Sequence, residues 1–436
     1  MARTAHTIRE AAHDCPECGQ ALTGGGHYVA WCTACAWNVD PEPPEETPGR
    51  IEGLRRRLAH QYGEQLLAEL TDPTTGTTAE LPASGHGRAG RLATVLAAAV
   101  HGVTVVLFGT GLWLLVGCWG RGALPVVGGL LIFLALVLRP RFKRLAEEEN
   151  HRRVLHRADA PRLFALLDEV AEAVGTTGVR TVVVDARVNA SVGSYGIRQH
   201  RVLHIGLGIW EVLSPQERIA LLGHEFGHYA HGDTRHLLLV GSAFQTLATW
   251  RYALAPAPAR TLIEHFTNLV LALPRLLVNG LLIALVHLTL RHSQRAEYLA
   301  DSSAARVGGG AAAARLMNWL IVTESITGML HREHVAARTR MNTAARHEGP
   351  AEELWERLAA RAASIPEHEH ERLRRVAELR GHQVDSTHPP THLRRRRLIH
   401  GMPSEPLLVL DPVRVAAIDA ELADARRSVA RELVRS

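Results

Sequence analysis

The stretch His224-Glu225-Phe226-Gly227-His228 decides how the rest of this sequence is interpreted. Just before it, Ser214-Pro215-Gln216-Glu217 combines a serine cap, a proline at the first helical position and a glutamate three residues after the serine. These are the signals of a helix start, so the sequence predicts a helix that continues through residues 218–231 and ends at Gly232. The two histidines of the stretch then lie on one face of that helix.

Histidines with this spacing can bind one Zn²⁺ ion. Glu225 projects about 100° round the helix from His224, so it would lie near the ion without binding it. A carboxylate in that position can take a proton from water. Alone, the pattern is only suggestive, because a chain with 26 histidines produces such spacings easily.

A third metal ligand must come from elsewhere in the chain. The segment Arg295–Asp301 offers Glu297 on a predicted helix that ends at the glycines 308–310. Asp301 follows one turn later on the same face and could accept the hydrogen bond that orients a ligand histidine. An exposed acidic pair on a solvated helix is the alternative, and the histidine motif favours the metal site over it.

Four of the five cysteines form two Cys-x-x-Cys pairs with thirteen residues between them, and these are Cys15, Cys18, Cys32 and Cys35. Each pair makes a tight turn that aims two thiolates at one point, so two pairs complete a tetrahedral zinc site. Metal binding would stabilise a segment with so little core, and we predict a zinc ribbon here. Two disulfides or free thiols are the alternatives. Cys118 is expected to be a small core residue.

Two long apolar runs, 93–119 and 123–138, are separated only by Gly120-Arg121-Gly122. The first exceeds the roughly 20 residues that span a bilayer, and together the runs predict a membrane hairpin rather than a buried hairpin of a soluble protein. Basic residues cluster before the first run and after the second. The positive-inside rule then places the N-terminal segment and everything after Arg139 in the cytoplasm of a multi-pass plasma-membrane protein.

Two further apolar stretches, 237–259 and 267–290, each carry an arginine near the middle. A central arginine costs roughly 2.5–3.5 kcal/mol on insertion, so these stretches could span the membrane, lie in its interface or pack on the catalytic domain. Because His228 and Glu297 must meet at one ion, the chain between them crosses the membrane zero or two times. Either choice keeps the site cytoplasmic.

Composition limits the remaining classes. The chain has 436 residues and a formal charge of +5. Its 46% hydrophobic content excludes a disordered chain, and its five cysteines are too few for a disulfide scaffold. No nucleic-acid partner is expected, because acidic residues nearly balance the basic ones and His27 is the one cationic candidate between the ribbon cysteines. The partner of the ribbon is left open.

The chain is predicted to divide into a ribbon (1–40), a linker with an amphipathic helix (41–91), a transmembrane hairpin (92–139) and a catalytic domain (140–436). The helix at 51–70 and the arginine run Arg394–Arg397 could contact anionic lipid. Each could equally be the solvated basic face of an ordinary helix.

Several of these motifs together resemble the membrane-bound zinc metallopeptidase family that contains HtpX and the CAAX prenyl endopeptidase. They are the histidine helix, the later Glu297–Asp301, the upstream Asn189-Ala190 and the downstream Thr387-His388-Pro389. The similarity covers about residues 90–400, and the ribbon is an addition to it. The resemblance implies a mainly α, α+β fold of the gluzincin type, with a small β-sheet over the active-site helix.

The resemblance also assigns roles. It implies zinc ligands at His224, His228 and Glu297, a general base at Glu225, an orienting carboxylate at Asp301, a substrate-binding edge strand at Asn189-Ala190 and an oxyanion-stabilising imidazole at His388. A turn asparagine and a surface histidine are the alternatives for the last two. With the ribbon, two Zn²⁺ ions are expected, one catalytic and one structural.

The predicted function is a membrane-bound zinc endopeptidase that hydrolyses membrane or misfolded proteins at the cytoplasmic face, with protein substrates and membrane lipids as partners. The alternative is a membrane-tethered zinc-ribbon adaptor whose peptidase fold is a non-catalytic scaffold. An intact set of ligands together with a base favours the enzyme.

Overall fold

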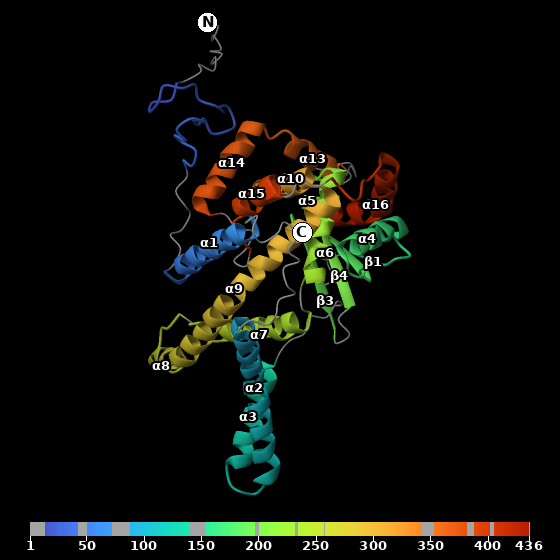
Figure 1. The fold of residues 1–436 in the computed structure, drawn as a ribbon. Helices are drawn as coiled ribbons and strands as arrows, with labels where there is room; N and C mark the ends of the chain where they lie inside the picture. The colour runs from blue at the N-terminus through green and yellow to red at the C-terminus, as the bar shows by residue number, and fades with distance from the viewer. Residues whose placement is uncertain are drawn as a thin grey trace.

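The computed structural model describes residues 14–41, 50–71, 88–139, 153–196, 200–231, 234–256, 258–341, 353–381, 388–401 and 405–435. Within the predicted linker segment 41–91, residues 42–49 and 72–87 lie outside the described residues. Helices make up most of the described chain, and a small sheet lies among them (Figure 1). The strands are β1 (Arg153–Leu155), β2 (Thr181–Asp185), β3 (Ala190–Tyr195) and β4 (His200–Gly206).

The helices follow the chain from the N-terminal segment to the C-terminal end. They are α1 (Arg50–Thr71), α2 (Arg88–Gly117), α3 (Leu124–Leu138), α4 (Pro161–Val174), α5 (Leu207–Trp210), α6 (Pro215–His231), α7 (Thr234–Ala253), α8 (Leu262–Val270), α9 (Ala272–Gly308), α10 (Gly310–Ile321), α11 (Thr323–Met341), α13 (Leu354–Ala363), α14 (Glu367–Arg380), α15 (Thr391–Gly401) and α16 (Pro412–Arg435).

The sheet is mixed, with the strand order β1-β2-β4-β3. β2 and β4 are parallel, and each outer strand is antiparallel to its neighbour. Every residue of β2 is buried, which suits its run of valines at 182–184, because β-branched side chains pack well on a sheet covered on both faces. β3 lies at the edge, next to α6 (Figure 1). The mainly helical α+β fold that the sequence predicts is confirmed.

Helix α6 begins where the sequence predicts. The Ser214 N–H donates to Glu217 Oε2 at 2.9 Å, and the Glu217 N–H donates to Ser214 Oγ at 3.4 Å. This pair of hydrogen bonds is a capping box, which satisfies two backbone donors at the helix start. Buried Ile219, Leu222 and Phe226 then face the core.

Helices α6 and α9 lie unusually close together because glycines occupy their contact. A Cβ atom at Gly227 would lie 2.7 Å from Ala300 Cα, and one at Gly308 would lie 2.6 Å from Ala220 N. Only glycine permits such an approach of two backbones. Because Gly227 belongs to the histidine motif itself, this contact brings α9 and its Glu297 up to the α6 histidines.

The predicted membrane hairpin is formed by α2 and α3, which project together from the body (Figure 1). They touch at Gly111 and Gly128, where an added Cβ at either glycine would lie 2.7–2.8 Å from the carbonyl oxygen of the other. Where this hairpin joins the body, α2 packs against α7 and α9 through an apolar cluster that includes Val100, Leu247 and Leu285.

Among the described residues, two helical segments are long and apolar enough to cross a membrane: α2 and the continuous run Leu262–Gly308, with α3 as a shorter apolar helix. Only 22% and 11% of their most apolar windows are buried. A core helix of a soluble protein would be mostly buried, so these helices present their apolar side chains outward. α7, which covers much of the predicted stretch 237–259, does not pass the same test, because polar residues interrupt it.

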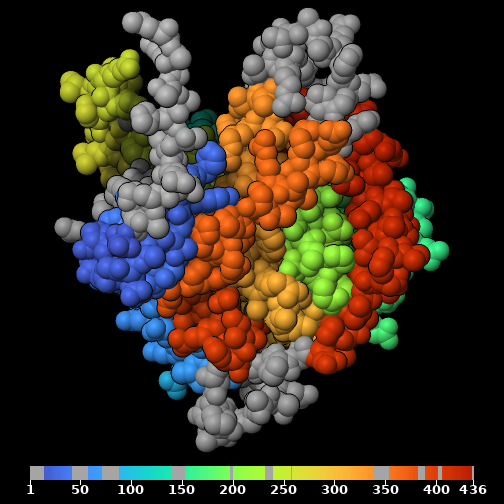
Figure 2. All heavy atoms as spheres, turned by 90° about the horizontal axis from the view of Figure 1, so that it is seen from above, coloured from blue at the N-terminus to red at the C-terminus, as the bar shows by residue number. Residues whose placement is uncertain are grey.

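The N-terminal segments pack against C-terminal helices, so the blue and orange-red parts of the molecule lie side by side in Figure 2. Leu66 and Leu67 of α1 are buried in a cluster with Tyr298 and Leu393. The apolar face of α1 is therefore used inside the molecule.

The ribbon lies against α14 through three arginines of that helix. Arg372 and Arg375 each donate at 2.8 Å to a ribbon carbonyl, of Val39 and Thr33 respectively. The Arg375 guanidinium also lies 4.9 Å from the ring centre of the fully buried Trp31. Arg380 forms a two-pronged salt bridge with Asp40, at 2.5 and 2.7 Å.

Candidate metal centres

The predicted catalytic ligands converge. His224 and His228 of α6 bring their Nε2 atoms to 3.2 Å from each other, and the carboxylate of Glu297 on α9 lies 3.6 Å and 3.5 Å from these two atoms. Ligand atoms about 2.0–2.1 Å from one tetrahedral zinc ion would be spaced by similar distances. Three residues from two helices are thus arranged as one metal site.

Burial supports this interpretation. Glu297 is 5% exposed, and its buried Oε2 atom accepts no hydrogen bond, although the Arg394 guanidinium lies 3.4 Å away. An unsatisfied buried carboxylate oxygen is costly, and a metal ion at the point where the three side chains meet would satisfy it. Burial also lowers the pKa of His224, which favours the neutral imidazole that a metal ligand needs. The residues therefore fit a zinc ion.

The Asp301 carboxylate lies 3.0 Å from His224 Nδ1, a position from which it could orient the imidazole. The structure adds a residue that the sequence analysis did not assign to the site. Arg394 of α15 is 1% exposed and donates two hydrogen bonds to Asp301, at 2.7 and 2.8 Å. Burial disfavours the charged guanidinium, but the Asp301 carboxylate outweighs it, and the pKa of Arg394 is raised.

This placement corrects the interpretation of Arg394–Arg397 as a run that contacts lipid or solvent. Arg394 is buried, Arg397 donates to the Tyr298 carbonyl, and Arg396 is exposed. A signal was present in the sequence: Leu398 follows Arg394 by four residues, so both lie on one face of the helix, and that face is buried.

Glu225 lies beside the histidines, 7% exposed, and accepts a hydrogen bond of 3.1 Å from the backbone N–H of Val192 in β3. Burial and the nearby Glu297 carboxylate raise its pKa to about 8, which the Val192 donor partly opposes. A dication bound by the neighbouring ligands would also oppose this rise. The side chain is placed within reach of both the metal position and the edge strand.

The edge strand begins at Ala190, so it includes only the second residue of the predicted pair, and the exposed Asn189 precedes it. The Asn189 carbonyl accepts a hydrogen bond of 3.0 Å from the Gly206 N–H. Sequence analysis missed Tyr229, one residue after the histidine motif. Its hydroxyl bonds the backbone of Gly193 and donates to the Val202 carbonyl at 3.1 Å, which ties α6 to strands β3 and β4.

His388 also reaches the site. Its Nε2 atom lies 3.1 Å from Glu297 Oε1, although 90 residues separate the two along the chain. Thr387 of the same predicted motif lies outside the described residues. The structure thus brings His224, Glu225, His228, Glu297, Asp301 and His388 together.

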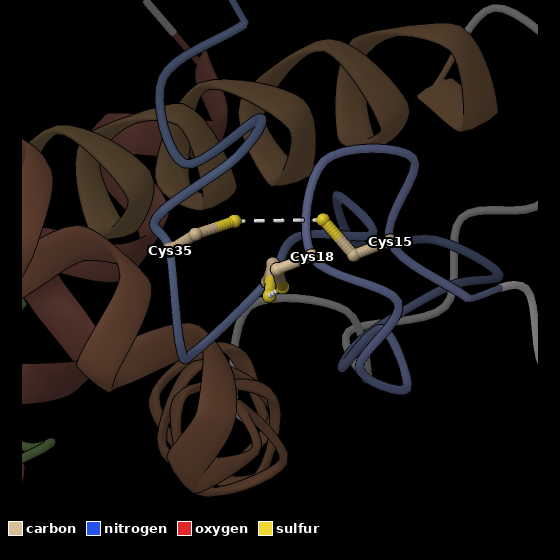
Figure 3. Close-up of side chains that lie close together, drawn as sticks. Cys15, Cys18 and Cys35 are labelled. Atoms are coloured by element: carbon tan, nitrogen blue, oxygen red, sulfur yellow. Dashed lines mark hydrogen bonds between the residues drawn. The ribbon is translucent and has the colours of Figure 1, made fainter.

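The four ribbon cysteines form the second cluster (Figure 3). Cys15, Cys18 and Cys35 point toward one another, and the Sγ–Sγ separations are 3.5 Å for Cys15–Cys35 and 3.4 Å for Cys18–Cys32. All four are free thiols, so the disulfide alternative is not what the structure shows. Four sulfurs at about 2.3 Å from one zinc ion would be spaced at similar distances.

The two ribbon turns have the same construction. Cys15 accepts a backbone hydrogen bond from Gly19, and Cys32 accepts one from Ala36, at 2.9 and 3.0 Å. Gly19 and Ala36 both have positive φ, +72° and +59°. The backbone N–H of Cys35 helps to lower the pKa of Cys32 to about 6, whereas burial and the neighbouring thiols raise the pKa of Cys35 to about 12. The Cys cluster fits a zinc ribbon.

A helix with two histidines, a base between them and a carboxylate from a second helix define a metallopeptidase. A family model described as Peptidase family M48 matches residues 157–400, more than half of the chain, and the chain belongs to this family, whose peptidases are zinc-dependent. The match includes the histidine helix, Glu297 and Arg394, whereas the ribbon, α1 and the α2–α3 hairpin precede it.

Several archaeal proteins named "Protease HtpX homolog" are similar to this chain. The one from Pyrobaculum calidifontis is 28% identical over 228 residues, which is 50% of this chain and 64% of that protein. The one from Methanothermobacter thermautotrophicus is 26% identical over 145 residues, 32% of this chain and 55% of that protein. The chain thus spans less than two thirds of the length of either relative. No solved structure matches the chain significantly.

Proposed function

We propose that this protein is a membrane-bound zinc endopeptidase that hydrolyses internal peptide bonds of membrane or misfolded proteins at the cytoplasmic face. The observation that carries the proposal is the meeting of His224, His228 and Glu297 within 4.8 Å of one another, with the buried Glu225 beside them. A non-catalytic scaffold has no need of a carboxylate next to a metal site.

In this proposal His224, His228 and Glu297 hold the zinc ion, and Asp301 and Arg394 hold His224 in place. A bound zinc ion supplies a Lewis acid that acidifies water and polarises a substrate carbonyl. Glu225 accepts the proton of the attacking water on its carboxylate and then gives it to the leaving amine nitrogen.

The substrate would be held as an extended strand along β3. Strand addition supplies main-chain hydrogen bonds without demanding a particular sequence, and β3 is an edge strand whose Val192 N–H already points to Glu225. Asn189 and Ala190 at its start would bind the substrate backbone. His388, 3.1 Å from Glu297, would donate to the oxyanion that develops on the carbonyl oxygen.

We further propose the domain division and topology indicated by the sequence. The ribbon (1–40) holds a second, structural zinc ion, the segment 92–139 forms a transmembrane hairpin, and residues 140–436 form the peptidase domain. Arginines on the outer ends of the hairpin favour a cytoplasmic location for both metal centres. The exposed apolar surfaces of α2 and of Leu262–Gly308 support contact with membrane lipids.

Glutamate substitutions test the proposal. Glu225→Gln should retain zinc but lose casein hydrolysis by about 10²–10⁴-fold, the usual contribution of a positioned acid–base group. Glu297→Ala should lose both zinc and hydrolysis, and 1,10-phenanthroline should abolish wild-type activity. Glu324→Gln, an exposed position on α11, is the matched control and should behave as wild type. Full casein hydrolysis by Glu225→Gln would refute the assignment and favour the adaptor.

A further inference from the structure

Helix α1 precedes the region that matches the peptidase family, yet it packs directly behind the proposed site. Its buried positions Ala59, Gly63, Leu66 and Leu67 lie one turn apart or adjacent on one face. They contact α9, which carries Glu297, and α15, which follows His388. The contact with α9 is polar as well as apolar.

Two buried side chains of α9 donate hydrogen bonds to backbone carbonyls of α1. Gln294 Nε2 donates to the Ala59 carbonyl at 2.8 Å, and the Tyr298 hydroxyl donates to the Gly63 carbonyl at 3.1 Å. Both side chains are fully buried. The donors are one helical turn apart on α9, and the acceptors are one turn apart on α1, so the two bonds fix how these helices lie against each other.

These donors flank the metal ligand. Gln294 precedes Glu297 by three residues and Tyr298 follows it directly, so both donors lie within one helical turn of the ligand. The contact with α1 therefore acts on the helical turn of α9 that carries Glu297. Outside the buried part of the contact, Arg291 and Glu69 also form an ion pair between the helices at 2.5 Å.

Helix α1 also contacts the turn that carries His388. A Cβ atom at Gly63 would lie 3.2 Å from Pro390 Cδ and from Leu393 Cδ1, and 3.7 Å from Pro389 Cβ. Pro389 follows His388 in the chain. The missing side chain at Gly63 thus lets the α1 backbone lie against the two prolines that lead from His388 into α15.

We propose that α1 is a brace of the peptidase site, with Gln294, Tyr298 and Gly63 as positioning residues. Its contact with Tyr298 fixes the position of the neighbouring Glu297 carboxylate relative to the α6 histidines. Its contact with the two prolines does the same for His388. The inference rests on the proposed function, and it makes the family domain incomplete without this preceding helix. Because α1 joins the ribbon to the membrane hairpin in the chain, the site would be linked to both.

The test compares paired substitutions in the full-length protein. Tyr298→Phe removes only the hydroxyl that donates to the Gly63 carbonyl. Its control is Tyr62→Phe, which removes the same group from a tyrosine of α1. Gly63→Leu forces α1 away from Pro390 and Leu393, and Gln61→Leu at an exposed position of the same helix is its control. All measurements are made well below the unfolding midpoint of each variant.

Two readouts are needed. The first is the rate at which 1,10-phenanthroline removes zinc from the proposed catalytic site, with the ribbon ion counted separately by its release on thiol modification. The second is kcat and KM for casein. We expect Tyr298→Phe and Gly63→Leu to lose the zinc about 10-fold faster and to lower kcat about 10-fold with little change in KM, as changes behind a metal ligand commonly do. The two controls should match the wild type.

A purely structural role for α1 predicts something different. Both variants would then unfold at lower temperature but, while folded, would keep wild-type zinc retention and kcat, and that result would overturn the proposal. If Gly63→Leu does not fold, Tyr298→Phe decides the matter alone. Zinc retention does not depend on peptidase activity, so failure of the brace and failure of the proposed function remain distinguishable.

Discussion

The ribbon and the peptidase site are two candidate metal centres that differ in how far apart their ligands lie along the chain. The ribbon takes its four ligands from positions 15–35, whereas the peptidase site joins His224 on α6 to Glu297 on α9 and is supported by Arg394 on α15. Around the cysteines there is little core beyond Trp31 and Val39, while the peptidase ligands belong to helices buried in the main core. The metal should therefore matter to folding in the first centre and to chemistry in the second.

Removing one ligand from each centre should give the largest contrast. Cys15→Ser and His224→Ala should each reduce two bound zinc ions to one. In Cys15→Ser, hydrogen-exchange protection across 14–41 should be lost almost completely, because small zinc domains of this kind are unfolded without metal. In His224→Ala, the amides of α6 and α9 should stay protected, because the packing of those helices needs no ion. A protected ribbon in Cys15→Ser, or exchange of α6 in His224→Ala, would erase the proposed difference.

A glycine substitution tests whether helix packing, rather than metal, assembles the peptidase site. Gly227→Ala places a Cβ 2.7 Å from Ala300 Cα, which forces α6 and α9 apart at a cost of about 1–3 kcal/mol. The unfolding midpoint should fall by several degrees and zinc should bind more weakly. Gly241→Ala in α7 meets no neighbour within 4 Å and should keep or raise the midpoint. Equal midpoints for the two variants would count against the packing argument.

The buried arginine provides a smaller effect on the same centre. Arg394→Lys keeps the charge but cannot reproduce the two-pronged bond to Asp301. His224 should then be oriented less firmly, and zinc affinity should fall about 10- to 100-fold. Arg396→Lys, two positions away and exposed, is the matched control. Chelator competition measures both, and unchanged affinity in Arg394→Lys would show that Asp301 needs no support from α15.

The same contrast explains what the sequence could predict. The ribbon and the capped start of α6 follow from local spacing and composition, and both lie where expected. Glu297, Asp301 and His388 were found because short motifs mark them. Arg394 and Tyr298 were not, because their roles depend on which helix faces them, and a run of four arginines or a lone tyrosine carries no local sign of its partner.

The α1 contact and the glycine approach of α6 to α9 belong to this second group. Both depend on pairs of backbones that meet across long stretches of chain, as at Gly63 with Pro390 and Gly227 with Ala300. Periodicity predicts that α1 has an apolar face but not what covers it. Tertiary packing, not composition, decides that this face lies against α9 and α15.

The smallest expected effect concerns how the two centres are joined. Arg375 of α14 donates to the Thr33 carbonyl within the second cysteine pair and lies over Trp31. The Thr33 carbonyl should be in place to accept this hydrogen bond only when the cysteine turn is folded around the metal. Arg375→Ala should weaken docking by about 1–2 kcal/mol, from one charged hydrogen bond and one cation–π contact. Hydrogen exchange across residues 31–41 should then become about 5- to 30-fold faster.

Arg374→Ala, which breaks only ion pairs within α14, should leave that exchange unchanged. An equal rise in both variants would mean that the ribbon responds to the stability of α14 and not to the contact itself. The peptidase site should keep its zinc in either variant, because its ligands come from α6 and α9.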